Sequence, residues 1–476
     1  RESSTGLRGV VGKPVAVFMD KSLAMIEGFM GAVYSGSFYC PIDVEMPAER
    51  IRTILGVLKP AAVLVSENSR ERAQALLDGL EGNPAGKEAD ARPQLIVAEE
   101  AYREPAEEKL LGEIRKKALD TDPLYVLFTS GSTGVPKGVL ISHRVLINNM
   151  EWLEEEYDFG PEDVLGNQVP FYFDVSDHDI YSVMKFGCSM VIIPPELFAF
   201  PVRLVEFLNE HRVTAIFWVP FALCMAANLN AFASAVPAYL RYIFFAGEVM
   251  PVRQLNYWRR YLPDACYCNM YGPTETYVCT YYNLNREFED GDSLPIGYAC
   301  KNMEILVLDE QNHLIRPGEE GEGELCVRGC ALSLGYYGDP KRTAERFVQN
   351  PLQNAWPETI YRTGDLVRYN AFGELEYLSR KDFQIKHLGY RIELGEIEAA
   401  AGAVEGVSAC ACVYDRGKRM ILLIYAGREM SKKEMTAALG SRIPRYMMPN
   451  RVIHMEELPR NANGKIDRRK LEELWT

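Results

Sequence analysis

Apolar runs and amphipathic segments alternate through the first part of the chain. An apolar run at residues 15–18 precedes a helical pattern at 25–34 and a second apolar run at 61–65. Buried strands separated by helices are typical of a parallel sheet covered on both faces. The pattern therefore predicts an α/β fold with a doubly wound region here, and a second such region with strands near residues 125–128, 190–193, 215–219 and 242–245.

The pattern changes twice along the remaining chain. Residues 67–120 are polar with little periodicity, so we expect a surface connection there. Residues 292–380 contain short alternating runs punctuated by Gly and Pro, which predict a small β-barrel or β-rich subdomain. After residue 382 the pattern indicates a compact α+β segment with helices near 393–403 and 432–439 and strands near 409–414 and 420–425. We therefore expect a large N-terminal domain over 1–381 and a small C-terminal domain over 382–476.

Composition narrows the class of protein. The chain has 476 residues, of which 47% are hydrophobic and 25% charged, as in globular proteins of several domains. It contains no run of about 20 apolar residues, so we expect no integral membrane segment. The net charge of −14 disfavours a nucleic-acid partner. The eleven cysteines lack zinc-site spacing and no signal peptide is visible, so we expect reduced core thiols and a cytoplasmic location.

The segment 127–138 is an apolar run that breaks into a loop of Gly, hydroxyl side chains and one Lys. Gly131, Gly134 and Gly138 allow backbone N–H groups to converge on an anion, and Lys137 adds a positive charge. The loop is not a Walker P-loop, because that motif needs Ser or Thr directly after the Lys, where this chain has Gly138. Composition alone does not distinguish a polyphosphate-binding loop from an ordinary surface turn.

Further motifs follow the loop in a fixed order. They are Tyr271-Gly-Pro-Thr-Glu275, Tyr361-Arg-Thr-Gly-Asp365, the segment from Arg380 to Glu393, and Asn461-Ala-Asn-Gly-Lys465. Together with the loop they resemble the adenylate-forming (ANL) superfamily over nearly the whole chain. The resemblance is to amino-acid adenylation domains of nonribosomal peptide synthetases and to D-alanine:carrier-protein ligases.

The resemblance implies a site for ATP and Mg²⁺. It assigns Glu275 to the magnesium ion, Thr274 to the α-phosphate, Asp365 to the ribose and Lys465 to the reacting carboxylate and α-phosphate. The remaining implied ATP-binding residues are Thr129, Ser130, Gly131, Ser132, Thr133, Gly134, Lys137, Gly247, Glu248, Asn269, Tyr271, Tyr377 and Arg380.

The segment around Asp174 indicates the class of substrate. Amino-acid-activating relatives hold the substrate ammonium with an Asp at this position, although Asp174 could instead cap the following helix. By resemblance the side-chain pocket is lined by Val175, His178, Phe217, Phe244, Ala246, Met270, Val278 and Cys279. These residues are mostly apolar and include no Asp, Glu, Lys or Arg, which predicts a small or medium neutral amino acid.

The resemblance also implies a two-step reaction. Asp382 falls at the family's hinge, and Lys386 and Gly389 fall where relatives line the tunnel for thioester formation. Aminoacyl-AMP would form with release of pyrophosphate, and the C-terminal domain would then rotate for transfer to the phosphopantetheine thiol of a carrier protein. The carrier would act in trans, or the chain would be an excised domain.

Other interpretations remain. Residues 179–181 and 247–251 are similar to D-alanine:carrier-protein ligases, but Ala246 stands where those enzymes have Cys. An acyl-CoA synthetase would use the same ATP site without needing Asp174. A catalytically silent nucleotide-binding protein is disfavoured because Lys465 and Glu275 are both present.

Overall fold

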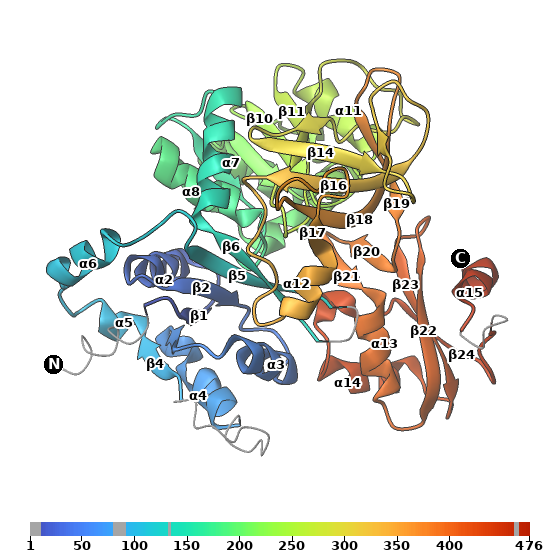
Figure 1. The fold of residues 1–476 in the computed structure, drawn as a ribbon, viewed down its shortest axis with the longest axis horizontal. Coiled ribbons are helices and arrows are strands. Elements are labelled where there is room, and N and C mark those ends of the chain that lie inside the picture. Colours follow the sequence, from blue (N-terminus) through green and yellow to red (C-terminus); the bar gives the residue numbers. More distant parts are fainter. Residues whose placement is uncertain (1–10, 80–91, 132–134, 461–465) are drawn as a thin grey trace.

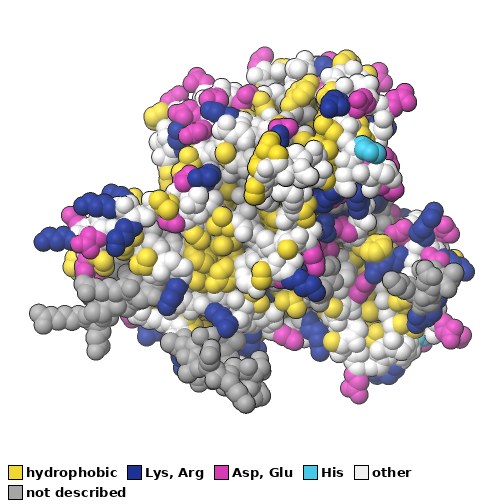
Figure 2. All heavy atoms as spheres, in the orientation of Figure 1, with side chains coloured by type: hydrophobic (Ala, Val, Ile, Leu, Met, Phe, Trp, Pro, Cys, Tyr) yellow, Lys and Arg dark blue, Asp and Glu magenta, His cyan; other side chains and the backbone are white. Residues whose placement is uncertain are grey.

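The computed structural model describes residues 11–79, 92–131, 135–460 and 466–476. Within them, three sheets follow one another along the chain and precede a smaller C-terminal part (Figure 1). Charged side chains of both signs are interspersed over the face in Figure 2, so no single patch on that face holds the net charge of −14. No helix in the described ranges is long and apolar enough to cross a membrane.

The first sheet has the strand order β4-β3-β1-β2-β5-β6 and is parallel except for the β5–β6 pair. Every residue of β1 and β2 is buried, which explains their continuous apolar sequences. The strands are β1 (Pro14–Phe18), β2 (Phe38–Ile42), β3 (Ala62–Val65), β4 (Gln94–Val97), β5 (Pro123–Thr129) and β6 (Lys137–Ser142). The helices are α2 (Leu23–Tyr34), α3 (Ala48–Leu58), α4 (Arg70–Asp78), α5 (Ala98–Ala101) and α6 (Glu108–Arg115).

The expectation of a plain surface connection over 67–120 is wrong in part. This segment supplies β4, which extends the sheet beside β3, together with α4, α5 and α6. The strand has four residues and only the last of them is buried. Such a short edge strand leaves little periodic signal in the sequence.

The second sheet has the order β13-β12-β11-β10-β9-β7-β8, in which β12 pairs antiparallel with both β11 and β13 and the other pairs are parallel. Three of the four strands expected in this region lie in this sheet, whereas the fourth, at residues 125–128, is β5 of the first sheet. The strands are β7 (Val164–Asn167), β8 (Ser189–Ile192), β9 (Ala215–Trp218), β10 (Tyr242–Ala246), β11 (Cys266–Tyr271), β12 (Thr280–Asn283) and β13 (Tyr298–Ala299). The helices are α7 (His143–Glu156), α8 (Ser176–Phe186), α9 (Pro201–Glu210), α10 (Pro220–Asn228) and α11 (Val252–Tyr261).

The third sheet is antiparallel, which confirms the predicted β-rich region. Its elements are β14 (Met303–Leu308), β15 (Leu314–Ile315), β16 (Gly323–Gly329), α12 (Pro340–Arg346), β17 (Phe347–Gln349), β18 (Thr359–Tyr369) and β19 (Leu375–Arg380). The C-terminal part begins with a hairpin and continues with a three-stranded sheet flanked by helices. Its elements are β20 (Gln384–His387), β21 (Tyr390–Glu393), α13 (Leu394–Gly402), β22 (Val407–Asp415), β23 (Met420–Gly427), α14 (Lys432–Gly440), β24 (Arg451–His454) and α15 (Arg468–Trp475).

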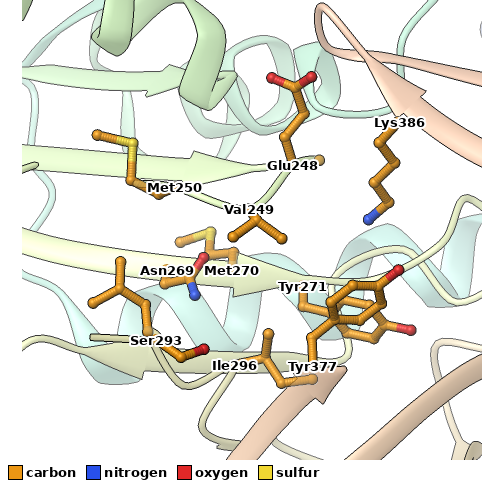
Figure 3. A pocket seen from close by; sticks show the side chains of 12 residues that line it. Glu248, Val249, Met250, Asn269, Met270, Tyr271, Ser293, Ile296, Tyr377 and Lys386 are labelled. Carbon is orange, nitrogen blue, oxygen red and sulfur yellow. The ribbon is translucent and has the colours of Figure 1, made fainter. Parts of the chain in front are cut away.

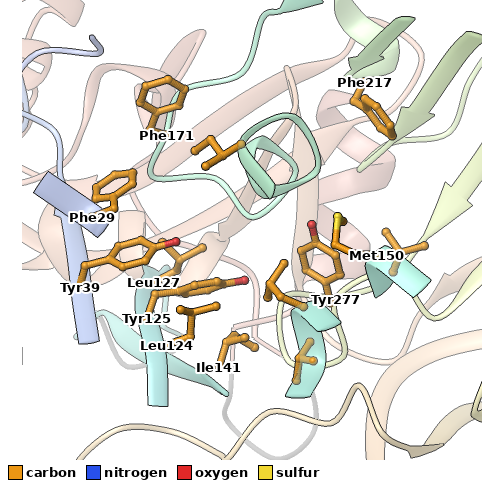
Figure 4. Close-up of a cluster of buried hydrophobic side chains, with 14 of the residues drawn as sticks. Phe29, Tyr39, Leu124, Tyr125, Leu127, Ile141, Met150, Phe171, Phe217 and Tyr277 are labelled. Atoms are coloured by element: carbon orange, nitrogen blue, oxygen red, sulfur yellow. The ribbon is translucent and has the colours of Figure 1, made fainter. Parts of the chain in front are cut away.

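One buried cluster, rich in aromatic side chains, joins the first two sheets (Figure 4). Phe29 on α2 stacks on Tyr39 of β2 with 4.2 Å between ring centroids, while Phe217 and Tyr277 enter the same cluster from the second sheet region. This shared core fixes the two sheets relative to each other, and Lys137 at the start of β6 contacts Glu275 in the turn after β11. All eleven cysteines are free thiols. Cys330 is exposed, so the expectation that the cysteines lie in the core is wrong for this residue.

Candidate active site

The glycine-rich loop lies between the antiparallel strands β5 and β6. Thr129 ends β5 and pairs in register with Lys137, the first residue of β6. The Thr129 hydroxyl is buried and has no hydrogen-bond partner among the described residues. Ser132, Thr133 and Gly134 lie outside the described residues. The two strands therefore bring a hydroxyl and a cationic side chain to the same end of the sheet.

Glu275 is the most heavily contacted carboxylate of the site. It lies in the turn after β11 and is fully buried. Lys137 Nζ lies 3.2 Å from its Oε1, Arg391 Nη1 lies 2.6 Å from its Oε2, and the Tyr336 hydroxyl donates to Oε1 at 2.7 Å. Burial alone would raise the pKa of Glu275, but the two positive charges hold it well below its usual range. Glu275 is therefore an ionised carboxylate that requires cationic partners.

The pKa of Lys137 is lowered by its position in this cluster. Burial and the nearby Arg391 charge lower its pKa to about 8, against the opposing influence of Glu275. Because 8 is still above neutral pH, the side chain remains mostly cationic there. The loop therefore keeps a positive charge available for an anion.

A pocket opens between β10, β11 and the hairpin β20–β21 (Figure 3). The space between its lining residues, counted out into the solvent at its mouth, is about 480 Å³. Of the predicted nucleotide residues, Gly247, Glu248, Asn269, Tyr271 and Tyr377 line it. Flat aromatic rings and apolar side chains beside a few polar groups are the usual lining of a purine site.

Asp365 lies buried on β18, next to Tyr271 of the pocket lining. It accepts hydrogen bonds from the Tyr271 hydroxyl and from Arg380 Nη1, the latter at 2.9 Å. Arg380 also donates from Nε and Nη2 to the two carboxylate oxygens of Asp382, each at 2.7 Å. Burial opposes ionisation of Asp382, but Arg380 lowers its pKa. The predicted ribose ligand and the predicted hinge residue are thus held by one guanidinium.

Asp174 lies just before α8 and next to the turn that carries Glu275. Its Oδ1 accepts from the Val175 N–H at 2.9 Å, and it also accepts a hydrogen bond from the Thr274 side chain. Burial raises the pKa of Asp174, and these hydrogen bonds only partly offset the rise. A cation placed beside Asp174 would restore the stability of its charged form.

Three stacked rings occupy the predicted side-chain pocket. His178 lies between Phe217 and Tyr277, at centroid distances of 4.9 Å and 5.0 Å. Phe244 packs on Phe217 at 4.7 Å. Burial lowers the pKa of His178 to about 3, so this ring is neutral at physiological pH. The pocket wall is therefore uncharged and bulky.

Of the other predicted pocket residues, Val175, Ala246, Met270 and Val278 pack in the same cluster as these rings, whereas Cys279 packs with Tyr271 in the cluster of the third sheet. Ala246 and Met270 are register partners on β10 and β11, and Val278 and Cys279 are buried just after the Glu275 turn. Met270 also lines the pocket of Figure 3, so it separates the two predicted binding regions.

The C-terminal part reaches into the site. Lys386 extends into the pocket of Figure 3, with Nζ 5.3 Å from the Tyr271 ring centroid, and burial lowers its pKa. Gly389 has φ +84 and packs so closely on Val219 that an added Cβ would lie 3.1 Å from a Val219 methyl. Lys465 lies outside the described residues.

Three contacts of the site have no counterpart in the sequence prediction. Arg391 lies two residues after Gly389, in a motif already recognised, and its position beside Glu275 could have been suspected from its charge. Tyr336 and Tyr277 come from loops without periodic signal. Their placement depends on tertiary packing, which residue spacing does not reveal.

Comparisons with known proteins agree with this geometry. The family model for AMP-binding enzymes matches residues 5–337, and that for the AMP-binding enzyme C-terminal domain matches 396–465. L-proline--[L-prolyl-carrier protein] ligase of Streptomyces coelicolor is 34% identical over 97% of this chain and 87% of its own length. Tyrocidine synthase 3 of Brevibacillus parabrevis is 32% identical over 96% of this chain, which spans only 7% of that protein.

Structural similarity extends over the whole fold. The Vibrio cholerae adenylation domain AlmE, solved with glycyl-adenosine-5'-phosphate, has a TM-score of 0.81 and 24% identity, and covers 99% of this chain and 90% of its own. At that identity the match speaks for the fold alone. Together with the family models and the sequence relatives, it shows that this chain belongs to the AMP-binding enzyme family and is an ATP-using, AMP-forming ligase.

Proposed function

We propose that this protein activates a small or medium neutral α-amino acid as its aminoacyl-AMP and transfers it to the phosphopantetheine thiol of a carrier protein. The observation that carries the proposal is the position of Asp174. Its carboxylate accepts from Thr274, the residue before Glu275, so a group suited to an ammonium lies beside the groups suited to phosphate and metal. The named relatives that act on prolyl-carrier protein and in tyrocidine synthesis support the carrier partner.

The proposed first step is attack by the substrate carboxylate oxygen on the α-phosphorus of ATP. A new P–O bond forms, the bond to the β-phosphate oxygen breaks, and pyrophosphate leaves. No general base is needed, because an amino-acid carboxylate is already ionised at neutral pH. Asp174 would orient the ammonium, Asp365 the ribose, and Lys137 and Lys465 would offset negative charge, so catalysis is mainly positioning and electrostatic stabilisation.

The site also fits a magnesium ion. Glu275 is an ionised, fully buried oxygen donor whose charge is balanced only while Arg391 and Lys137 contact it. A hard divalent cation prefers such a carboxylate together with phosphate oxygens. We therefore propose that Glu275 holds Mg²⁺, which when bound would balance the charge of the triphosphate.

We further propose that residues 1–381 form the core that binds ATP and amino acid, and that 382–476 form a domain that moves about Asp382. Separate hydrophobic clusters within residues 385–475 support this division. The side-chain pocket supports neutral substrates, since its wall of Phe217, Phe244 and a neutral His178 offers no charge to pair with.

Amino-acid-dependent exchange between ATP and labelled pyrophosphate tests this function. A panel of proline, glycine, D- and L-alanine, larger neutral residues and charged residues should give exchange with one or a few neutral members. D-alanine alone would identify the D-alanine ligase alternative. Exchange driven only by fatty or aryl acids would falsify the amino-acid assignment and favour an acyl-CoA synthetase.

A further inference from the structure

His178 presents two unused hydrogen-bonding atoms in the predicted side-chain pocket. The residue is 1% exposed, and neither Nδ1 nor Nε2 has a hydrogen-bond partner among the residues that the structure describes. A neutral imidazole carries one N–H donor and one acceptor nitrogen. Buried polar groups in native proteins are normally paired, and leaving one unpaired is costly. The ring edge of His178 is therefore a position at which hydrogen bonds would stabilise a bound molecule.

Two aromatic rings stack on this imidazole. Phe217 lies with 4.9 Å between ring centroids and 6° between ring planes, and Tyr277 lies at 5.0 Å. Figure 4 shows both of these side chains in the buried cluster. Burial lowers the pKa of His178 to about 3, so the ring is neutral at physiological pH. Stacking thus holds an uncharged ring in place and leaves the nitrogens on its edge for another partner.

His178 follows Asp174 by one helical turn. The Asp177 N–H donates to the Asp174 carbonyl at 3.0 Å, and Val175 has the helical torsion angles φ −57 and ψ −28, so the chain is helical before α8 begins. Side chains four residues apart lie on the same face of a helix. The face that offers Asp174 to a substrate ammonium therefore also carries His178, about 6 Å further along the helix axis.

The chemistry of this position selects among substrate side chains. A neutral ring offers no charge to an ionised side chain, and an apolar side chain would leave both nitrogens of His178 unpaired. Hydroxyl and carboxamide groups both donate and accept hydrogen bonds and carry no charge. Resting on the proposed function, we infer that the substrate is a neutral amino acid whose side chain carries a hydroxyl or carboxamide group, and that His178 binds this group.

Pairs of amino acids with nearly the same shape isolate this hydrogen bond. Threonine and valine, serine and 2-aminobutyrate, asparagine and leucine, and glutamine and methionine differ in polarity but little in size. The value of kcat/KM is measured for each by amino-acid-dependent exchange between ATP and labelled pyrophosphate. In the pair that contains the best substrate, the polar member should be favoured at least about tenfold, because its apolar counterpart leaves buried polar atoms unpaired.

His178→Phe removes both nitrogens and keeps a flat ring for Phe217 and Tyr277 to stack on. The preference for the polar member should fall at least about tenfold in this variant. The ratio of the two kcat/KM values does not depend on the folded fraction, because both substrates meet the same active molecules. A loss of stability alone therefore leaves the preference unchanged. His178→Gln, which keeps a donor and an acceptor, should retain part of the preference.

His454, on β24 of the C-terminal part, provides a matched control. Its Nε2 lies 2.8 Å from the Gly427 carbonyl oxygen, and its ring lies 5.2 Å from that of Tyr425. His454→Phe therefore makes the same replacement beside a tyrosine ring, but outside the predicted side-chain pocket. This variant should keep the preference of the unchanged protein.

The outcomes separate this inference from the proposed function. A preference for the polar member that His178→Phe loses and His454→Phe keeps supports His178 as the group that binds the substrate side chain. A preference that both variants lose, or that His178→Phe keeps, overturns the inference. The best exchange with proline or another amino acid without a hydrogen-bonding side chain also overturns it, while amino-acid activation stands. Exchange driven only by fatty or aryl acids overturns the proposed function itself.

Discussion

Asp174→Asn tests the assignment of the substrate ammonium. The replacement keeps the size and shape of the side chain and can still accept from Val175 N–H and Thr274, the two contacts that hold Asp174 in place. It removes the negative charge beside which the ammonium would lie. The variant should therefore fold normally and lose only the attraction for the substrate.

The size of the effect follows from the environment of Asp174. Its carboxylate has a raised pKa because burial is only partly offset, so pairing with a cation is worth more here than at an exposed surface. A hydrogen bond between charged groups contributes about 1.5–3 kcal/mol. At about 1.4 kcal/mol for each factor of ten, kcat/KM for the amino acid should fall by roughly 10- to 150-fold.

The assay is pyrophosphate exchange at varied amino-acid and varied ATP concentrations. The loss should fall on the amino acid, with the KM for ATP nearly unchanged. Asp174→Glu, which keeps the charge but lengthens the side chain, serves as a comparison for position. An unchanged kcat/KM for the amino acid in Asp174→Asn would refute the reasoning.

Three further predictions concern other side chains. Lys465→Ala should abolish pyrophosphate exchange while ATP binding, measured by calorimetry, stays largely intact; unchanged exchange would contradict the role assigned to Lys465. Phe217→Ala should shift kcat/KM toward larger neutral amino acids by roughly 10- to 200-fold, with thermal unfolding as the check on folding, and an unaltered preference would remove Phe217 from the pocket. The pKa of His178 is about 3 in the folded protein, against an ordinary value of 6.5. As the pH falls below 6.5, the unfolded chain therefore binds a proton at His178 and the folded protein does not. The free energy of unfolding should then decrease by up to about 1.4 kcal/mol per pH unit. His178→Phe should flatten this acid loss in urea unfolding between pH 6 and 4, and an identical slope would show that His178 is not buried in its neutral form.

The sequence predicted six of the thirteen strands described in the first two sheets, namely β1, β3, β5, β8, β9 and β10. β1 and β9, for example, are buried at every residue and have no polar positions to confuse the pattern. β4 was missed because three of its four residues are not fully buried. Continuous burial was not sufficient either, because β2 is also buried at every residue and was not predicted.

The sequence predicted the site residues that belong to short motifs. It did not predict the contacts that depend on tertiary packing. Glu275, Asp365 and Lys137 belong to short motifs, and the structure brings Glu275 and Lys137 together although they are far apart in the chain. The contact of Glu396 with Gly131 depends on how the C-terminal part docks on the large part. No spacing within the sequence encodes that orientation, because it depends on contacts between residues far apart in the chain.

Isotope transfer tests the central claim of amino-acid adenylation most directly. The protein is incubated with ATP and a neutral amino acid labelled with ¹⁸O in its carboxylate, and the products are examined by mass spectrometry. Attack on the α-phosphorus predicts that one ¹⁸O atom appears in AMP after the aminoacyl group is transferred or hydrolysed. Label found in inorganic phosphate, with ADP as the nucleotide product, would contradict the account.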